Sequence, residues 1–373
     1  MREAAKPEGI VIESESRARE GDTDASARAE ASGERRGARR STRTGIVRDA
    51  APAALAIAAA VTLGELLGAT VPVIGPAASA LLVGILIRLW YTPTEAGRPV
   101  IAFASRTVLK AAIVVLGATF GLSELLRVGG RSLPLMLGTL AAALLVMYPV
   151  GRALRVDWNL TTLVGVGTAI CGASAIGAIS GVIEASEVEI AYAISTIFVF
   201  NVAAVILFPA IGHLLGLSQQ SFGMWAGTAV NDTSSVVATA SAYGHAATQV
   251  AVVTKLARTT MIVPIAFALA LTTRRRAAVG TEPKAQTRVW RLLPGFLVLF
   301  LAAAAVNTAG LISPSTARDL ARIAAVLITV ALASIGLSTS VRDLRRTGYR
   351  PLLLGAVLWA VVAVSGLLLQ TVI

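Results

Sequence analysis

Charged and amide side chains lie deep inside apolar runs of this 373-residue chain. At the 1.5 Å rise of a helix, Asn201, Asp232 and Arg258 each lie about 15–18 Å from the start of their runs, near a bilayer centre. Lys255 lies about 10 Å in, one turn from Arg258 on the same helix face. Charges at this depth cost about 2.5–3.5 kcal/mol each, so they normally face a bundle interior and are paired or functional. Two cations against one carboxylate leave a surplus positive charge, which favours an anion as ligand.

Two structural interpretations compete with anion binding. Asp232 and Arg258 would neutralise one another if their helices pack together, and Lys255 would reach the outer headgroups on its flexible stem. If the surplus cation instead stays in the bundle, neutral donors beside Asp232 complete an oxyanion site. The predicted substrate-binding residues are Lys255, Arg258, Asn201, Asn231, Asp232, Thr233, Ser234, Cys171, Gly172, Ser174, Gly336 and Ser338.

Interrupted helices would add backbone donors to such a site. The run 159–183 contains GVGTAICGASAIGAISG, whose glycines on their own favour a small-residue packing face. Gly172 and Ser174 at mid-depth also fit an unwound turn, and a second candidate break favours that interpretation. Five runs later, ALASIGLSTS places Gly336 and Ser338 in a second candidate break. Half-helix N-termini at these breaks would direct N–H donors and a positive dipole end toward an anion.

Apolar runs fill the chain from about residue 51 to its end and position these groups. The composition, 55% hydrophobic and 14% charged, excludes a soluble domain. Each run approaches the roughly 20 helical residues that a hydrocarbon core requires, so we predict an all-α membrane protein with about eleven transmembrane helices. The runs are 51–69, 74–91, 104–121, 132–151, 159–183, 189–215, 221–243, 248–271, 292–312, 319–338 and 351–372.

The order of these runs suggests an internal repeat. Lys110 in the third run and Lys255 in the eighth lie at similar depths, and the two candidate breaks are also five runs apart. This offset predicts two inverted halves with discontinuous helices that cross near the midplane. Bases gather in the even-numbered connections, which places the N-terminus in the cytoplasm and the C-terminus outside.

Charge and motifs exclude several other classes of protein. Residues 1–48 form a charged tail without an apolar face and are predicted to be disordered and cytoplasmic, whereas 49–373 form the transmembrane domain. The first 50 residues hold 11 bases and 10 acids, so most of the net charge of +12 lies in short membrane loops and predicts no nucleic-acid partner. The mid-depth groups include no nucleophile beside a base, so we expect neither an enzyme nor a cofactor or metal site.

Five blocks of the sequence resemble a bacterial family described as sulfate exporters, an uncharacterised multi-pass membrane family related in fold to sodium/proton antiporters and bile-acid symporters. The blocks are GTAICGASAIGA (167–178), FVFNVAAVILFPAIGHLLGLS (198–218), FGMWAGTAVNDTSSVVA (222–238), VVTKLARTTMIVP (252–264) and ASIGLSTSVRDLRRTGYRPLLLG (333–355). The resemblance covers about residues 50–373. It implies two inverted five-helix repeats with crossed discontinuous helices, preceded by the run 51–69 as an extra N-terminal helix. Of the predicted site residues it points to 171–174, Asn201, 231–234, Lys255 and Arg258. A histidine commonly precedes the aspartate of the 222–238 block in this family, whereas this chain has Asn231, which leaves proton coupling open.

We therefore expect a secondary transporter of the bacterial plasma membrane. It would export a small oxyanion, such as sulfate or an organosulfur anion, by alternating access, with Lys255 and Arg258 compensating the substrate's charge. The alternative is a cation/proton antiporter that uses Asp232 as its carrier carboxylate. The true substrate, a coupling ion (proton or sodium) and a homodimer are left open by the sequence.

Overall fold

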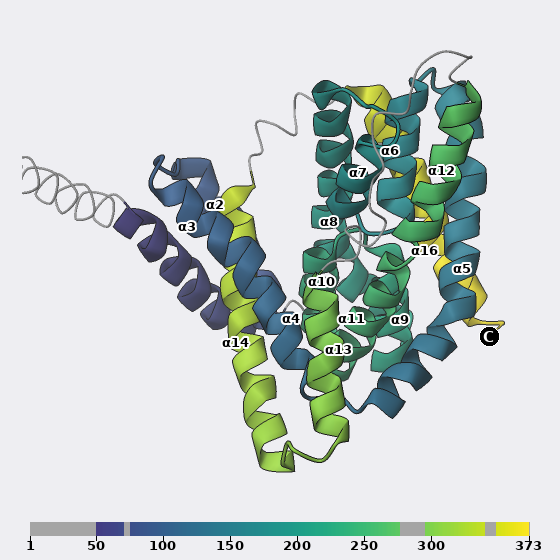
Figure 1. Ribbon diagram of the computed structural model, residues 1–373. Helices are drawn as coiled ribbons and strands as arrows, with labels where there is room; N and C mark the ends of the chain where they lie inside the picture. Colours follow the sequence, from purple (N-terminus) through teal and green to yellow (C-terminus); the bar gives the residue numbers. More distant parts are fainter. Residues whose placement is uncertain (1–49, 71–74, 277–294, 340–347, 373) are drawn as a thin grey trace, which may run out of the picture.

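The computed structural model describes residues 50–70, 75–276, 295–339 and 348–372 (Figure 1). Within these ranges the chain forms helices and no strand, which confirms the all-α class. The predicted tail 1–48 lies outside the described residues, as do the bases expected in 277–294 and 340–347, so these predictions stay untested.

Seven helices of the described ranges are long and apolar enough to cross a membrane, which supports a multi-pass membrane protein. They are Ala50–Thr70, Gly97–Gly117 (α3 Gly97–Phe103, η1 Ala104–Val108 and α4 Leu109–Gly117), α5 (Leu122–Ala153), α8 (Glu187–Leu214), His245–Ala270 (α11 His245–Thr259 and part of α12 Ile262–Arg276), α14 (Pro314–Ser338) and α16 (Tyr349–Gln370). Two shorter apolar helices are α2 (Gly75–Trp90) and α13 (Gly295–Thr308). The remaining helices, α6, α7, α9 and α10, form two hairpins.

The run 159–183 breaks at Gly172, where the sequence predicts an unwound turn. α6 (Trp158–Ala169) ends there, and α7 (Ala173–Ser180) begins after Gly172, whose φ of 66° lies in the left-handed region that favours glycine. The amide of Asn159 lies 3.5 Å from the carboxylate of Glu189, so α8 begins beside the start of α6. If α6 and α7 formed one continuous crossing, about 30 Å long, the chain would have to return along its whole length to reach the start of α8. The six residues between α7 and α8 reach at most about 21 Å, which is too short for this return. α7 therefore turns back, and α6 and α7 form a hairpin.

The predicted single span 221–243 is wrong, because this segment is a second hairpin. α9 (Gln219–Ala229) and α10 (Thr233–Tyr243) are separated by a turn, and the carboxylate of Asp232 caps α10 by accepting from the N–H of Ser234. The Tyr243 hydroxyl donates to the carbonyl oxygen of Leu217 at 2.5 Å, and its ring stacks on that of Phe222. α10 thus ends beside the residue that precedes α9.

The two hairpins open at opposite ends of α8 and meet near its middle. The first opens beside Glu189 and the second beside Leu217. At the tips, the Asp232 N–H donates to Asn201 Oδ1 at 3.2 Å, and a Cβ at Gly172 would lie 3.3 Å from that of Asp232. The crossing helices implied by the resemblance are therefore replaced by hairpins that meet tip to tip, with α6 and α7 above α9 and α10 in Figure 1.

The break predicted at Gly336 is also wrong, because α14 runs without interruption to Ser338. A Cβ at Gly336 would collide with the backbone carbonyl oxygen of Leu81 and crowd the Cα of Gly84, both in α2. The glycine therefore permits close approach of two helix backbones, a role that small residues commonly have in membrane bundles.

Two groups of helices pack around separate apolar clusters. The hairpin body consists of α5–α12 and α16, and its cluster includes Trp225, which stacks on Phe208 with ring centroids 4.2 Å apart. The panel consists of Ala50–Thr70, α2–α4, α13 and α14, and its cluster, which includes Leu116 and Phe300, extends onto one face of α10 and α11. Figure 1 shows most of the panel at the left and the hairpin body at the right.

Candidate functional site: a cavity at the hairpin tips

A cavity of about 420 Å³ lies between the hairpin tips and the panel. Its walls join polar groups of α7, α10 and α11 to residues of η1, α4, α13 and α14. The cavity brings together half of the predicted site residues, namely Cys171, Ser174, Asp232, Thr233, Ser234 and Ser338. The other lining residues are Ser105, Arg106, Leu109, Lys110, Ile113, Ala173, Thr259, Phe296 and Ile335.

Both half-helix N-termini at the tips border this cavity. α7 begins at Ala173 with no side-chain cap, and Ala173 and Ser174 are exposed, so its first N–H groups are available to a ligand. At α10, Asp232 already accepts from the N–H and the hydroxyl of Ser234. The positive ends of two helix dipoles thus point toward the cavity, an arrangement that favours an anion.

The panel contributes two cations that the sequence analysis did not assign to the site. Arg106 lies in the π-helical turn η1 and Lys110 one turn later in α4, and both side chains are exposed along the cavity wall. π-helical turns inside α-helices are frequent at functional sites. With Asp232 as the one carboxylate among the lining residues, the cavity carries a surplus positive charge. The spacing of four residues between Arg106 and Lys110, which places both on one helix face, was the signal that could have identified them together.

Lys255 and Arg258 lie behind the tips, fully buried, and do not line the cavity. The Lys255 ammonium donates to the carbonyl oxygens of Ile170 and Val230, each at 2.8 Å. Arg258 Nε donates to the Ala169 oxygen at 2.5 Å, and one terminal nitrogen lies 3.5 Å from the Thr168 oxygen. These carbonyls form the C-terminal ends of α6 and α9, where cations offset the negative end of the helix dipole.

This arrangement contradicts both structural interpretations of the buried charges. Across the described ranges no ion pair joins Asp232 to Arg258 or Lys255. Lys255 is 0% exposed, so its ammonium does not extend to the headgroup region. Instead, Lys255 donates to a carbonyl oxygen of each hairpin, and Arg258 donates to carbonyl oxygens of the first hairpin.

The remaining predicted residues support the tips from behind or lie at a distance. Asn201 in α8 accepts a hydrogen bond from the Asp232 N–H. Asn231 is 1% exposed, and its amide has no hydrogen-bond partner within the described part of the chain. Gly336 packs against α2, two residues before the cavity-lining Ser338.

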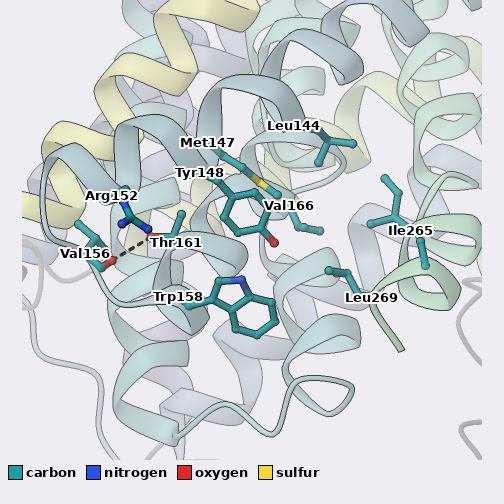
Figure 2. Close-up of a pocket in the computed structure, with 11 residues that line it drawn as sticks. Leu144, Met147, Tyr148, Arg152, Val156, Trp158, Thr161, Val166, Ile265 and Leu269 are labelled. Carbon is teal, nitrogen blue, oxygen red and sulfur yellow. Dashed lines mark hydrogen bonds between the residues drawn. The ribbon is translucent and has the colours of Figure 1, made fainter. Parts of the chain in front are cut away.

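A second cavity, of about 630 Å³, lies between α5, α6 and α12 (Figure 2). Its walls are mostly apolar, with Leu144, Met147, Ile265 and Leu269 among them. Figure 2 shows Tyr148 beside Trp158, whose ring centroids are 6.4 Å apart. Arg152 is the one cation among its lining residues, whereas the cavity at the hairpin tips has two cations and the uncapped N-terminus of α7, so the latter is the better candidate site for an oxyanion. Among the described residues no group of three His, Cys, Asp or Glu side chains is arranged to hold a metal ion.

Comparison with known proteins identifies relatives along most of the chain. The model of a family described as Conserved hypothetical protein 698 matches residues 52–355. A UPF0324 membrane protein of Streptococcus pyogenes serotype M6 is 41% identical over 312 residues, which cover 82% of this chain and 91% of that protein. A UPF0324 membrane protein of Clostridium tetani is 36% identical over 310 residues, covering 80% and 89%. No solved structure matches the chain significantly.

Proposed function

Because the chain belongs to the Conserved hypothetical protein 698 family of membrane proteins, we propose that it is a secondary transporter that exports a small oxyanion by alternating access. Sulfate or an organosulfur anion is the expected substrate. In this proposal the protein lies in the bacterial plasma membrane with its N-terminus in the cytoplasm and its C-terminus outside.

One observation carries the proposal, namely the positive cavity between the hairpin tips and the panel. Unpaired N–H groups of α7, hydroxyls of Ser174 and Thr233, and the cations Arg106 and Lys110 surround the same space. Such donors hold oxyanions by charge-assisted hydrogen bonds. The site lies between the hairpin body and the panel, so in this proposal a movement of the hairpin body against the panel carries it from one membrane face to the other.

The direct test uses the full chain in proteoliposomes loaded with radiolabelled sulfate, sulfite, thiosulfate or taurine. We expect efflux of at least one of these compounds above that of protein-free vesicles. Imposed proton and sodium gradients, applied separately, identify the coupling ion. Efflux no faster than in protein-free vesicles for all four compounds under every gradient would overturn the proposal.

Neutralising the panel cations should weaken substrate binding. A hydrogen bond to a charged group contributes about 1.5–3 kcal/mol, so Arg106→Gln or Lys110→Gln is expected to raise the half-saturating substrate concentration roughly 10- to 100-fold. Efflux measured over a range of internal substrate concentrations checks this. Arg318→Gln, at an exposed position at the start of α14, is the matched control and should leave half-saturation unchanged. Equal half-saturation in all three variants contradicts the assigned site.

The alternative, a cation/proton antiporter, is favoured by the position of the Asp232 carboxylate in the cavity. Asp232→Asn separates the two functions, because asparagine caps a helix about as well as aspartate but carries no charge. We expect this variant to keep oxyanion efflux. Loss of efflux in Asp232→Asn, together with sodium/proton exchange by the unmodified protein, would favour the antiporter instead.

A further inference from the structure

The carbonyl ends of α6 and α9 converge on a single side chain. Ile170 and Val230 belong to different hairpins that open at opposite ends of α8, yet their carbonyl oxygens each lie 2.8 Å from the Lys255 ammonium. The C-terminal end of each helix carries a partial negative charge of roughly half an electron. Without a cation between them, two such ends would repel one another in a medium of low dielectric constant.

Lys255 and Arg258 differ in what they connect. Both carbonyl oxygens that accept from Arg258 belong to the first hairpin. Lys255 contacts both hairpins. Within the described ranges, its two hydrogen bonds are the ones that link one hairpin tip to the other. It is 0% exposed, and no carboxylate forms an ion pair with it within these ranges. Its charge is therefore balanced mainly by the two helix ends.

We propose that Lys255 is a built-in cation that fastens the two hairpin tips together, in the place where their converging carbonyl ends would otherwise require a bound inorganic cation. Unwound backbone carbonyls and half-helix C-terminal ends coordinate sodium in other membrane transporters. Here the chain supplies the cation itself, so tip contact needs no sodium. Lys255 acts as a positioning residue, because it lies behind the tips and holds Gly172 against Asp232, where the N-termini of α7 and α10 face the cavity.

Chemical rescue tests this assignment. Lys255→Ala removes three carbons and the ammonium group, which n-propylammonium replaces. We expect the purified variant to unfold at a lower temperature than the unmodified protein and to regain most of that loss with n-propylammonium, since a ligand of the folded state stabilises it by mass action. Tetramethylammonium, which has the charge but no N–H donor, should restore much less. Rescue of oxyanion efflux is expected to follow the same order of cations.

Two further variants keep the test decisive. Lys255→Met fills the same space without a charge, so it should be destabilised and show no rescue, and it also serves if Lys255→Ala does not accumulate. Lys110→Ala removes the same atoms from an exposed lysine, and its unfolding temperature should not respond to n-propylammonium. Stability of Lys255→Met equal to that of the unmodified protein, or no response of Lys255→Ala to any cation, would overturn the proposal. The unfolding measurement requires no transport, so it distinguishes failure of this inference from failure of the proposed function.

Discussion

Replacing Arg258 with glutamine is expected to abolish oxyanion efflux while the protein remains in the membrane. The substitution removes both donors to the C-terminal carbonyls of α6, and each buried acceptor left unpaired costs about 1–3 kcal/mol. It also leaves Lys255 as the one cation at the negative end of α6, so that end is less compensated where the tip borders the cavity. Efflux from loaded proteoliposomes and the unfolding temperature in detergent measure the two effects.

Two arginine variants serve as controls for Arg258→Gln. Arg322→Gln changes a side chain that is 83% exposed and should leave both efflux and stability unchanged. Arg258→Lys retains a cation with fewer and differently placed donors, so it should fall between glutamine and the unmodified protein. Full sulfate efflux by Arg258→Gln would refute the role assigned to the buried cations.

Replacing Gly336 with alanine is expected to give the largest loss of stability among the predictions that concern the panel. The new Cβ would collide with the Leu81 carbonyl oxygen and crowd the Gly84 Cα, and these atoms are backbone that cannot rotate away. Overpacking of this kind typically costs about 1–3 kcal/mol, or more where neighbours cannot move. Thermal unfolding in detergent checks the magnitude.

Gly177→Ala is the matched control for Gly336→Ala. It introduces the same methyl group in α7, where a Cβ would meet nothing within 4 Å, and alanine favours a helix interior by about 0.5–1 kcal/mol over glycine. We expect this variant to be as stable as the unmodified protein or slightly more so. Similar losses in both variants would contradict the role assigned to the contact of α14 with α2, because helix propensity alone predicts a gain in each.

Composition and hydropathy were sufficient to predict a helical membrane protein. The turn predicted at Gly172 is confirmed, although the second break at Gly336 that supported this prediction is not. The direction of the chain after a turn was not predictable from these quantities. α9 and α10 have eleven residues each, and three residues join them, so together they are about as long as one complete transmembrane helix. Hydropathy alone therefore does not distinguish a hairpin from a helix that crosses the membrane. One sequence feature did indicate the second turn. Asp232, followed by Thr233 and two serines, is a typical N-cap residue, and its position inside an apolar run indicates that a new helix begins there.

The partners of the buried charges were not predictable either, because they depend on where the chain turns back. The sequence placed Asp232 and Arg258 at similar depth, with Lys255 one turn shallower, and an ion pair between Asp232 and Arg258 was one of the interpretations. Charge counting cannot reveal that backbone carbonyls neutralise the two cations, because every residue carries a carbonyl and only an unwound tip leaves it free to accept. Likewise Gly336 resembled a helix breaker in sequence, whereas its position against α2 shows that it permits close packing.

The single cysteine of the chain gives the cavity a native chemical reporter. Cys171 is at the tip of the first hairpin and borders the cavity, yet it is only 2% exposed. Because the thiol is almost fully covered here, a maleimide that cannot cross lipid is expected to react with it only when a movement uncovers the tip, and only from the face toward which the cavity then opens. Alkylation rates compared between sealed vesicles of opposite sidedness would follow the reorientation of the unmodified protein, without any engineered label.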